Sequence, residues 1–158
     1  MSKITPCLWF DTEGEAAMRL YISLFPNSQV LDTSYYGAEA GERAGTLLTA
    51  TFTLAGQQYR VLNGGPQFKL NEAISLSVDC ADQEEVDYYW SRLTADGGEE
   101  SMCGWLKDKY GLSWQIVPSA LGRLMSDPDP AKAGRVMQAL MPMRKIDIAT
   151  LERAHAGA

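Results

Sequence analysis

Few side chains in this sequence carry the chemistry of a catalytic or metal-binding site. There is one histidine, His155, and there are three cysteines, Cys7, Cys80 and Cys103, which lie far apart and form no CxxC pair. A catalytic thiol needs a base or a positive charge to lower its pKa, and His155, which we expect at the surface of the C-terminal tail, gives Cys7 no obvious partner. The cysteine spacing indicates neither a disulfide framework nor a zinc site. We therefore expect reduced thiols in a cytoplasmic protein.

Two polar residues, Arg60 and Gln115, lie in segments that otherwise have the pattern of buried strands. A guanidinium group binds carboxylates and phosphates, so Arg60 either receives an anionic group of a substrate or pairs with a neighbouring acidic side chain. A buried amide must be satisfied, so Gln115 hydrogen-bonds either a ligand or neighbouring hydroxyls and water. Trp9 and Trp105 are either flat apolar walls for a planar ligand or simple core aromatics.

The composition limits the class of protein. A chain of 158 residues suits one domain or two small fused halves, and 46% hydrophobic residues are enough for a core. The net charge of −6, with basic residues scattered along the chain, argues against a nucleic-acid-binding protein. No apolar run approaches the length of a membrane span, and the N-terminus lacks the layout of a signal peptide. We expect no nucleic-acid partner and no membrane contact.

Two helices are predicted to begin with capping boxes, in which a cap residue is followed three positions later by a glutamate. Thr12 with Glu15 is the first pair, and Asp82 with Glu85 is the second. The expected elements of the first half are a strand over 3–11, a helix ending near 24, a strand over 29–36, a loop over 37–45, and paired strands over 47–54 and 57–63.

The clearest pattern is the alternation in TLLTATFTLAGQQYRVLNGG, which predicts a hairpin with one apolar and one threonine-rich face. A two-residue turn at 55–56 places Phe52 opposite Tyr59 and brings Arg60 and Leu62 to the threonine face. The threonines on that face are Thr49, Thr51 and Thr53.

The same order of elements repeats in the second half. The strand over 72–80 alternates, and we expect Ile74 to face the helices together with Leu76 and Val78. The stretch CGWLKDKYGLSWQIVP predicts a hairpin with its turn at 108–111. The remaining predicted elements are a helix over 83–95, a short strand near 101, and tail helices over 120–125, 131–141 and 147–155, with Val136, Leu140 and Leu151 as packing residues.

This doubled order and several motifs resemble a known family. The segments TPCLWFD, LYISLFP at the end of the first helix, LNGGPQFKLNEAISLSV, ADQEEVDYYW, CGWLKDKYGLSWQIVP and MPMRKIDIATLERA of the tail are similar to the PhnB-like branch of the vicinal oxygen chelate superfamily, the glyoxalase and bleomycin-resistance fold. That branch often carries the label 3-demethylubiquinone-9 3-methyltransferase. The resemblance covers nearly the whole chain, and NGGPQF and GWLKDKYGLSWQ are its most specific motifs.

The resemblance implies an α+β fold in which two βαβββ modules form a curled mixed, mainly antiparallel sheet, with helices outside and a small-molecule cavity inside. The glyoxalase-type domain is expected over 1–118, with module one over about 1–66 and module two over about 67–118. A helical extension is expected over 119–158. Pockets of this superfamily are often completed across a twofold interface, so a homodimer is also expected.

Metal-dependent relatives place one ligand, usually histidine or glutamate, on the first and fourth strand of each module. The resemblance carries these positions to Cys7, Leu62, Ala73 and Gln115. Leucine and alanine have no donor atom and a neutral amide is a poor substitute for a carboxylate, so we expect no metal and no other cofactor. The residues expected to line the ligand pocket are Cys7, Trp9, Thr49, Thr51, Arg60, Leu62, Ala73, Ser75, Trp105, Ser113 and Gln115.

The sequence leaves two hypotheses for the function. In the first, the chain is a metal-free binding protein for a small organic molecule. In the second, it is an enzyme of unknown reaction that uses Arg60 and polar pocket residues for electrostatic stabilisation. Methyl transfer is not supported, because no glycine-rich strand-to-helix turn of the kind that binds S-adenosylmethionine follows the first strand, where FDTEGEA holds a single glycine.

Overall fold

The computed structural model describes residues 2–158, and its first half contains one α-helix and four strands in the predicted order. These elements are β1 (Cys7–Phe10), α1 (Gly14–Leu24), β2 (Gln29–Tyr35), β3 (Leu47–Leu54) and β4 (Gln57–Asn63). The segment predicted as a loop contains a short 3-10 helix, η1 (Ala38–Arg43), so that prediction was wrong in detail.

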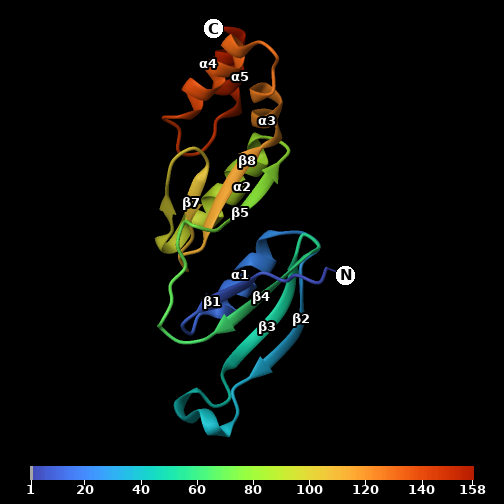
Figure 1. Ribbon diagram of the computed structural model, residues 1–158, viewed down its shortest axis with the longest axis vertical. Coiled ribbons are helices and arrows are strands. Elements are labelled where there is room, and N and C mark those ends of the chain that lie inside the picture. Colours follow the sequence, from blue (N-terminus) through green and yellow to red (C-terminus); the bar gives the residue numbers. More distant parts are fainter. Residues whose placement is uncertain (1) are drawn as a thin grey trace. The chain divides into compact units, whose positions relative to one another are not determined.

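The second half repeats the order and adds a helical tail. Its elements are β5 (Ser75–Cys80), α2 (Gln83–Thr94), η2 (Ala95–Gly97), β6 (Glu99–Glu100), β7 (Trp105–Lys107), β8 (Ser113–Pro118), α3 (Ser119–Met125), α4 (Pro130–Leu140) and α5 (Ile148–Ala156). Contacts divide the chain into two compact units that meet in sequence at Leu70 and Asn71. Figure 1 shows the two units and their elements.

Both units contain a four-stranded sheet with the same topology. The strand order is β1-β4-β3-β2 in the first and β5-β8-β7-β6 in the second. In each sheet the first and fourth strands of the module pair in parallel, and the other neighbours are antiparallel. The fold class predicted from the sequence, two βαβββ modules with a helical extension, is therefore confirmed.

Helix α1 covers one face of the first sheet. Leu8, Phe52 and Val61 point to this face and are buried, as are Met18 and Tyr21 of the helix. The predicted capping box of Thr12 and Glu15 was wrong.

The helix instead begins after Glu13 without a side-chain cap. The amide of Gly14 donates to Oδ1 of Asn63 at 2.8 Å, so a side chain from β4 satisfies one of the free donors at the helix start.

The second predicted capping site forms. Oδ1 of Asp82 accepts from the amide of Glu85 at 2.9 Å, and the Glu85 carboxylate accepts in return from the amide of Ala81 at 2.7 Å. Val86, Trp90 and Leu93 of α2 are buried, as their helical spacing predicts. Ile74 was predicted to join this core but precedes β5 and is 56% exposed, so that prediction was wrong.

The two hairpins follow the predicted registers. Phe52 pairs with Tyr59 across β3 and β4, joined by a turn at residues 55–56. In the second hairpin the buried Asp108 accepts from the amides of Tyr110 and Leu112, at 2.8 and 3.1 Å, and its Oδ2 accepts from Nε1 of Trp114 at 2.9 Å. One carboxylate thus holds both the turn and the first buried indole after it.

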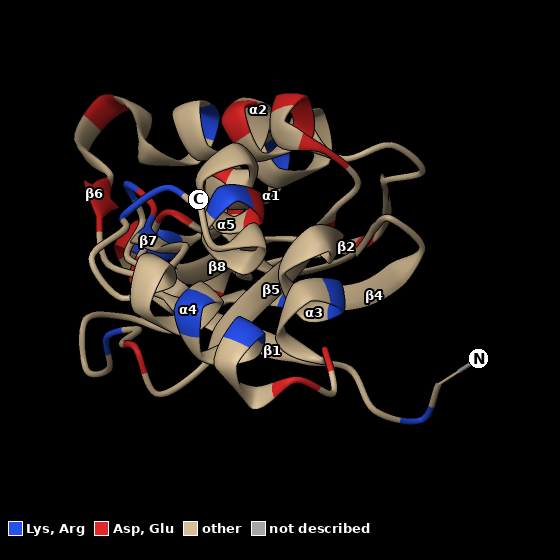
Figure 2. Ribbon diagram, turned by 90° about the horizontal axis from the view of Figure 1, so that it is seen from above, with Lys and Arg blue, Asp and Glu red and all other residues tan. Residues whose placement is uncertain are grey.

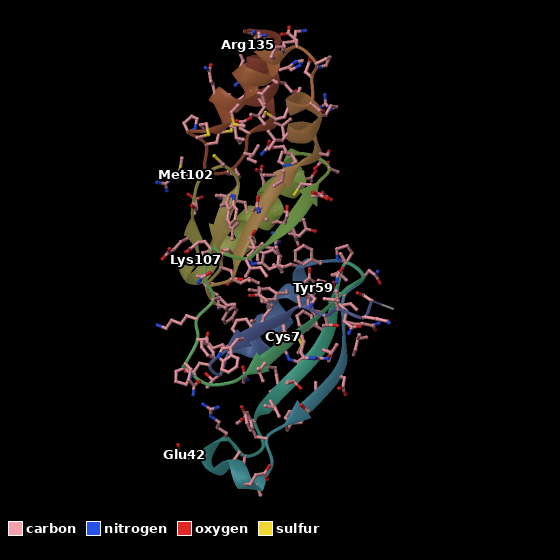
Figure 3. All side chains as sticks on the ribbon, viewed as in Figure 1. Cys7, Glu42, Tyr59, Met102, Lys107 and Arg135 are labelled. Atoms are coloured by element: carbon pink, nitrogen blue, oxygen red, sulfur yellow. The ribbon has the colours of Figure 1, made fainter. Side chains whose placement is uncertain are left out.

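The helical tail packs on the second unit around its own apolar cluster. Val136, Leu140 and Leu151 are buried, as predicted, and Ile146 joins them. Arg135, labelled in Figure 3, donates from Nε and Nη2 to two backbone carbonyls of α5 at 2.9 Å each.

Backbone contacts join the tail to the sheet. The amides of Cys103 and Gly104 donate to the carbonyls of Met143 and Arg144 at 2.7 and 2.8 Å. The side chain of Gln83 donates to the carbonyl of Ile146 and accepts from the amide of the first α5 residue. The tail is therefore continuous with the core of this unit.

His155 was predicted as a surface residue, but it takes part in the packing of the tail. Its Nε2 lies 2.8 Å from Oδ2 of Asp127, and the two side chains are only 24% and 23% exposed.

Among residues 2–158, every helix is too short or too polar to span a lipid bilayer.

Candidate functional site

The open face of the first sheet carries six of the side chains predicted to line a pocket. Parallel pairing of β1 with β4 sets Cys7 beside Arg60 and Trp9 beside Leu62. Antiparallel pairing of β3 with β4 sets Thr51 beside Arg60 and Thr49 beside Leu62. Because α1 covers the other face, this face is the one left for a ligand within the first unit.

Arg60 is the only cation on this row of the open face. It is exposed, and its Nε donates to Oγ1 of Thr51 at 3.3 Å. No ion pair joins Arg60 to an acidic side chain among residues 2–158. Of the two interpretations of Arg60 from the sequence, pairing with a neighbouring carboxylate is therefore not observed.

Cys7 beside it does not have the properties of an activated nucleophile. Partial burial against the sheet raises the pKa of the Cys7 thiol, and the positive charge of Arg60 opposes that rise without reversing it. The imidazole of His155 belongs to the other unit's tail, where it contacts Asp127. The thiol is therefore mainly protonated at neutral pH.

Trp9 is held in place by the glycines of the NGG motif. Its Nε1 donates to the carbonyl of Gly65 at 2.9 Å, and its ring lies directly over Gly64, where an added Cβ would come within 2.4 Å. Phe68 meets the ring edge-on, with 5.0 Å between centroids, and is itself 65% exposed. The sequence prediction missed Phe68, which extends the aromatic surface beside the open face.

The open face of the second sheet is also polar. Ser75, Ser113 and Lys107 form one row across β5, β8 and β7, and Trp105 pairs with Gln115 in the next row. Ala73 was predicted on this face, but it lies before β5 and is exposed. The opposite face, with Leu106, Trp114 and Ile116, is buried against α2.

Gln115 makes the neighbouring hydrogen bond that the sequence offered as one alternative. Its Nε2 donates to Oγ of Ser75 at 3.0 Å. Ser113 differs, because its side chain is buried, with the residue 1% exposed, and its hydroxyl has no hydrogen-bond partner among residues 2–158. Such orphan hydroxyls are uncommon in folded proteins. The alternation of the strand predicts which face Ser113 lies on, but it does not predict that its hydroxyl makes no hydrogen bond.

A small cavity lies over the strands of the second sheet. Its volume is about 140 Å³, and its lining includes Trp105, Lys107 and Ser113 together with residues of β6. Lys107, labelled in Figure 3, contacts the Glu72 carboxylate, and this hydrogen bond lowers the pKa of Glu72. The sequence prediction missed Glu72 and Lys107, although the alternation of the hairpin places Lys107 on the face of Ser113.

The positions that metal-dependent relatives use do not form a ligand set. Leu62 and Ala73 have no donor atom, and Gln115 already donates to a serine. In the described part of the chain, no three His, Cys, Asp or Glu side chains come together as a metal site.

Comparison with known proteins identifies the family. The family model described as 3-demethylubiquinone-9 3-methyltransferase matches residues 2–117, about three quarters of the chain. The chain belongs to this family. The match ends before the α3–α5 tail and does not include it. No curated protein sequence matches the chain.

Solved structures share the fold of this chain. The PhnB protein from Bacillus cereus is 35% identical, with a TM-score of 0.69 over 75% of this chain and 100% of its own. Protein PA1353 from Pseudomonas aeruginosa (16% identity, TM-score 0.59, 75% and 98% covered) and the fosfomycin resistance protein FosX from Listeria monocytogenes (17%, 0.55, 77% and 94%) share the fold. The predicted PhnB-like resemblance is confirmed.

Proposed function

We propose that this member of the family binds small organic molecules on the open polar face of each sheet, without a metal ion. The observation that carries the proposal is Arg60, an exposed guanidinium on the open face whose one hydrogen bond, to Thr51, uses little of its capacity. A guanidinium has five N–H donors in a fixed fork, which matches a carboxylate or a phosphate.

The two faces have the composition of a ligand site. Hydroxyl, amide and indole groups alternate with the buried residues on the helix side, and this pattern supplies a few oriented polar groups beside apolar surface. FosX has been solved with Mn(II) and with a dihydroxypropylphosphonic acid, a small anionic ligand of a related fold. The proposed site differs because two of its four metal positions, Leu62 and Ala73, have no donor atom.

Methyl transfer is not part of this proposal. The turn between β1 and α1 is Asp11-Thr12-Glu13, which is acidic and lacks glycine, and Gly14 donates its amide to Asn63. That turn therefore lacks the glycines by which a strand-to-helix turn binds a nucleotide cofactor.

The test is a thermal-shift screen of anionic and aromatic metabolites, run with and without EDTA. Binding to the native state raises Tm by mass action. We expect at least one anionic compound to raise Tm equally in both conditions. Arg60→Ala should lower the affinity for that compound by about tenfold, the usual loss when a charged hydrogen-bond partner is removed. Arg19→Ala, which changes an exposed arginine of α1, is the control and should leave the affinity unchanged.

Failure of every compound to bind, or binding only with added metal, would contradict the proposal. Formation of a product from any compound of the same panel would instead support the hypothesis that the protein is an enzyme.

We also infer that the chain forms a homodimer and works in the cytoplasm. All three cysteines are free thiols and Cys7 is exposed, which suits a reducing compartment. The edge strand β2 exposes Val30, Leu31 and Tyr35, an apolar set that a second copy could cover. Light scattering coupled to gel filtration should give twice the chain mass.

A further inference from the structure

The open faces of the two sheets differ in charge. Figure 2 shows that β6, at the edge of the second sheet, is acidic along its length. Lys107 on the neighbouring strand is neutralised by Glu72. On the first sheet, by contrast, Arg60 has no ion pair within the described part of the chain. An anionic ligand is therefore attracted to the first face and not to the second.

Apolar surface lies next to this cation along β4. Alternation puts Arg60 and Leu62 on the open side of the strand, because Val61 between them is buried on the helix side. Gly64, one residue past the end of the strand, continues the same row. It has no side chain, and the six-membered ring of Trp9 fills the space above it, within 2.4 Å of where a Cβ would lie. A guanidinium, a leucine and an indole therefore follow one another along one strand.

The aromatic end of this row is fixed in place and open to solvent. Nε1 of Trp9 donates to the carbonyl of Gly65 at 2.9 Å, which sets the plane of the indole. Phe68 meets the indole at an interplanar angle of 79° and is 65% exposed. Leu62 beside them is half-buried. Two aromatic side chains at nearly right angles form a corner against which a third ring can pack.

The cationic end of the row has free donors for an acid group. Nε of Arg60 donates to Oγ1 of Thr51 at 3.3 Å, which leaves Nη1 and Nη2 without a partner among the described residues. The Thr51 hydroxyl accepts this bond and keeps its own proton for a ligand. Asp32 pairs with Thr51 on the edge strand β2, but it is exposed and forms no ion pair with Arg60. Its charge weakens the attraction for an anion without neutralising the guanidinium.

The rise of the strand sets the length of the ligand. Two residues along β4, roughly 7 Å, separate Arg60 from Leu62. A ring that packs on Leu62 against the aromatic corner therefore needs its acid group about that far from its centre. A spacer of two carbon atoms between ring and carboxylate covers this distance, because each carbon–carbon bond is about 1.5 Å long. A carboxylate attached directly to the ring is too close to reach both ends.

We propose that the open face of the first sheet binds an arylalkanoate, an aromatic ring joined to a carboxylate by a short carbon chain. The carboxylate binds Arg60 and Thr51. The chain crosses Leu62, and the ring packs against Trp9 and Phe68. The unpaired guanidinium selects an acid over an amine, and the aromatic corner selects a ring over an aliphatic chain. The inference rests on the proposed function, that this face holds a small molecule, and it names the chemical class of that molecule.

The test is an NMR titration of the full chain with 3-phenylpropanoate, following the amides of Arg60 and Leu62 and the indole N–H of Trp9. We expect these three signals to shift together, with a Kd of about 1 mM for so small a ligand. Butanoate lacks the ring, 3-phenylpropanamide lacks the charge and benzoate lacks the spacer, so each should bind about tenfold more weakly. The cation 3-phenylpropylammonium should not bind at these residues.

Variants at the two ends of the row test the two contacts separately. Arg60→Gln should remove the preference for the acid over the amide. Phe68→Ala changes an exposed side chain, so the fold should be kept, and it should lower the affinity for 3-phenylpropanoate about threefold without changing that for butanoate. Val30→Ala is the matched control, because Val30 is exposed and pairs with Phe52 on the helix side of the sheet, and it should change neither affinity.

The carboxylate next to Thr51 gives an effect of opposite sign. Asp32→Asn removes a negative charge from the row of Arg60 and should raise the affinity for 3-phenylpropanoate about twofold at low salt. Glu15→Gln removes the same charge from α1, on the covered face of the sheet, and should leave the affinity unchanged. Equal effects of the two variants would show that the acid group does not lie on this row.

The outcomes separate this inference from the proposed function. Equal affinities for butanoate and 3-phenylpropanoate, both lowered in Arg60→Gln, would overturn the aromatic class and keep an anion site on this face. An unchanged affinity in Phe68→Ala would overturn the assigned position of the ring. No binding by any of these compounds or by any compound of the metabolite screen would overturn both.

Discussion

Asp108 shows how a single carboxylate can fix a local structure. It accepts from two turn amides and from the indole of Trp114, and both side chains are buried. The aspartate is therefore structural, although an acidic residue between two aromatic-rich strands could be mistaken for a catalytic acid.

We predict that Asp108→Ala lowers the free energy of unfolding by about 3–5 kcal/mol, because three donors lose their acceptor in a buried setting. Asp108→Asn keeps one carbonyl acceptor and should cost less. Urea denaturation of the three proteins measures both differences. A loss below about 1 kcal/mol for the alanine variant would show that the turn does not depend on this carboxylate.

The pair of Asp127 and His155 should make stability depend on acidity. A hydrogen bond from the Asp129 amide and the contact with His155 lower the pKa of Asp127. A carboxyl group with a lowered pKa in the folded state contributes stability above its unfolded pKa of about 3.9, and this contribution is lost as pH falls through the folded pKa.

The expected result is a steeper fall of the urea midpoint between about pH 5 and pH 3 for the native chain than for Asp127→Asn. Parallel curves for the two proteins would contradict the assignment.

At the scale of elements, the β3–β4 turn contains a conformation that its sequence does not favour. Ala55 has φ of +48° and Gly56 has φ of +83°. A left-handed conformation costs a residue with a Cβ about 1–2 kcal/mol, and glycine avoids most of this cost.

We predict that Ala55→Gly raises the free energy of unfolding by about 0.5–1 kcal/mol. Ala16→Gly, at an exposed position within α1, should lower it by about 1 kcal/mol. Thermal unfolding followed by circular dichroism gives the sign of each change. A destabilised Ala55→Gly variant would show that the turn tolerates alanine without strain.

Elements with strong periodicity could be predicted from sequence, and elements set by long-range contacts could not. Alternation fixed the faces of β3, β4 and β8, because a strand with one buried face allows only one register. The start of α1 was missed because its donor is satisfied by Asn63, 49 residues away. Ile74 was misplaced because β5 begins one residue later, at Ser75.

The candidate site was predictable to the same extent. Sequence alternation predicted the open faces, but the partners of Gln115 and Lys107, and the lack of one for the Ser113 hydroxyl, depend on which strands are neighbours. Which strands are neighbours follows from the strand order of the sheet, and the pattern of residues within one strand does not give that order.

At the scale of the molecule, each unit repeats one topology, and the second unit adds a tail beyond the residues that match the family. Gly104 is where the tail meets the sheet. Its φ is +86°, and an added Cβ would come within 2.8 Å of Ile146 and 2.9 Å of the Ile116 carbonyl. No side chain fits at this position without displacing the tail or β8.

We predict that Gly104→Ala costs about 3 kcal/mol or more, through strain and overpacking together. Gly134→Ala, a matched change in α4 with open space around it, should add about 0.5–1 kcal/mol instead. Limited proteolysis should cut the tail of the first variant sooner than that of the native chain. Equal resistance of both variants would show that the tail does not depend on this close contact.

The three thiols differ in solvent exposure, which allows one of them to be labelled selectively. Cys7 is exposed on an open sheet face, Cys103 is partly covered, and Cys80 is buried with its pKa raised to about 12 by burial and nearby carboxylates. Partial burial also raises the pKa of the Cys7 thiol, so accessibility and not acidity sets the order, and a maleimide dye added at mildly alkaline pH should attach to Cys7 first. The chain thus contains, without engineering, an attachment point for a fluorescent reporter beside Arg60.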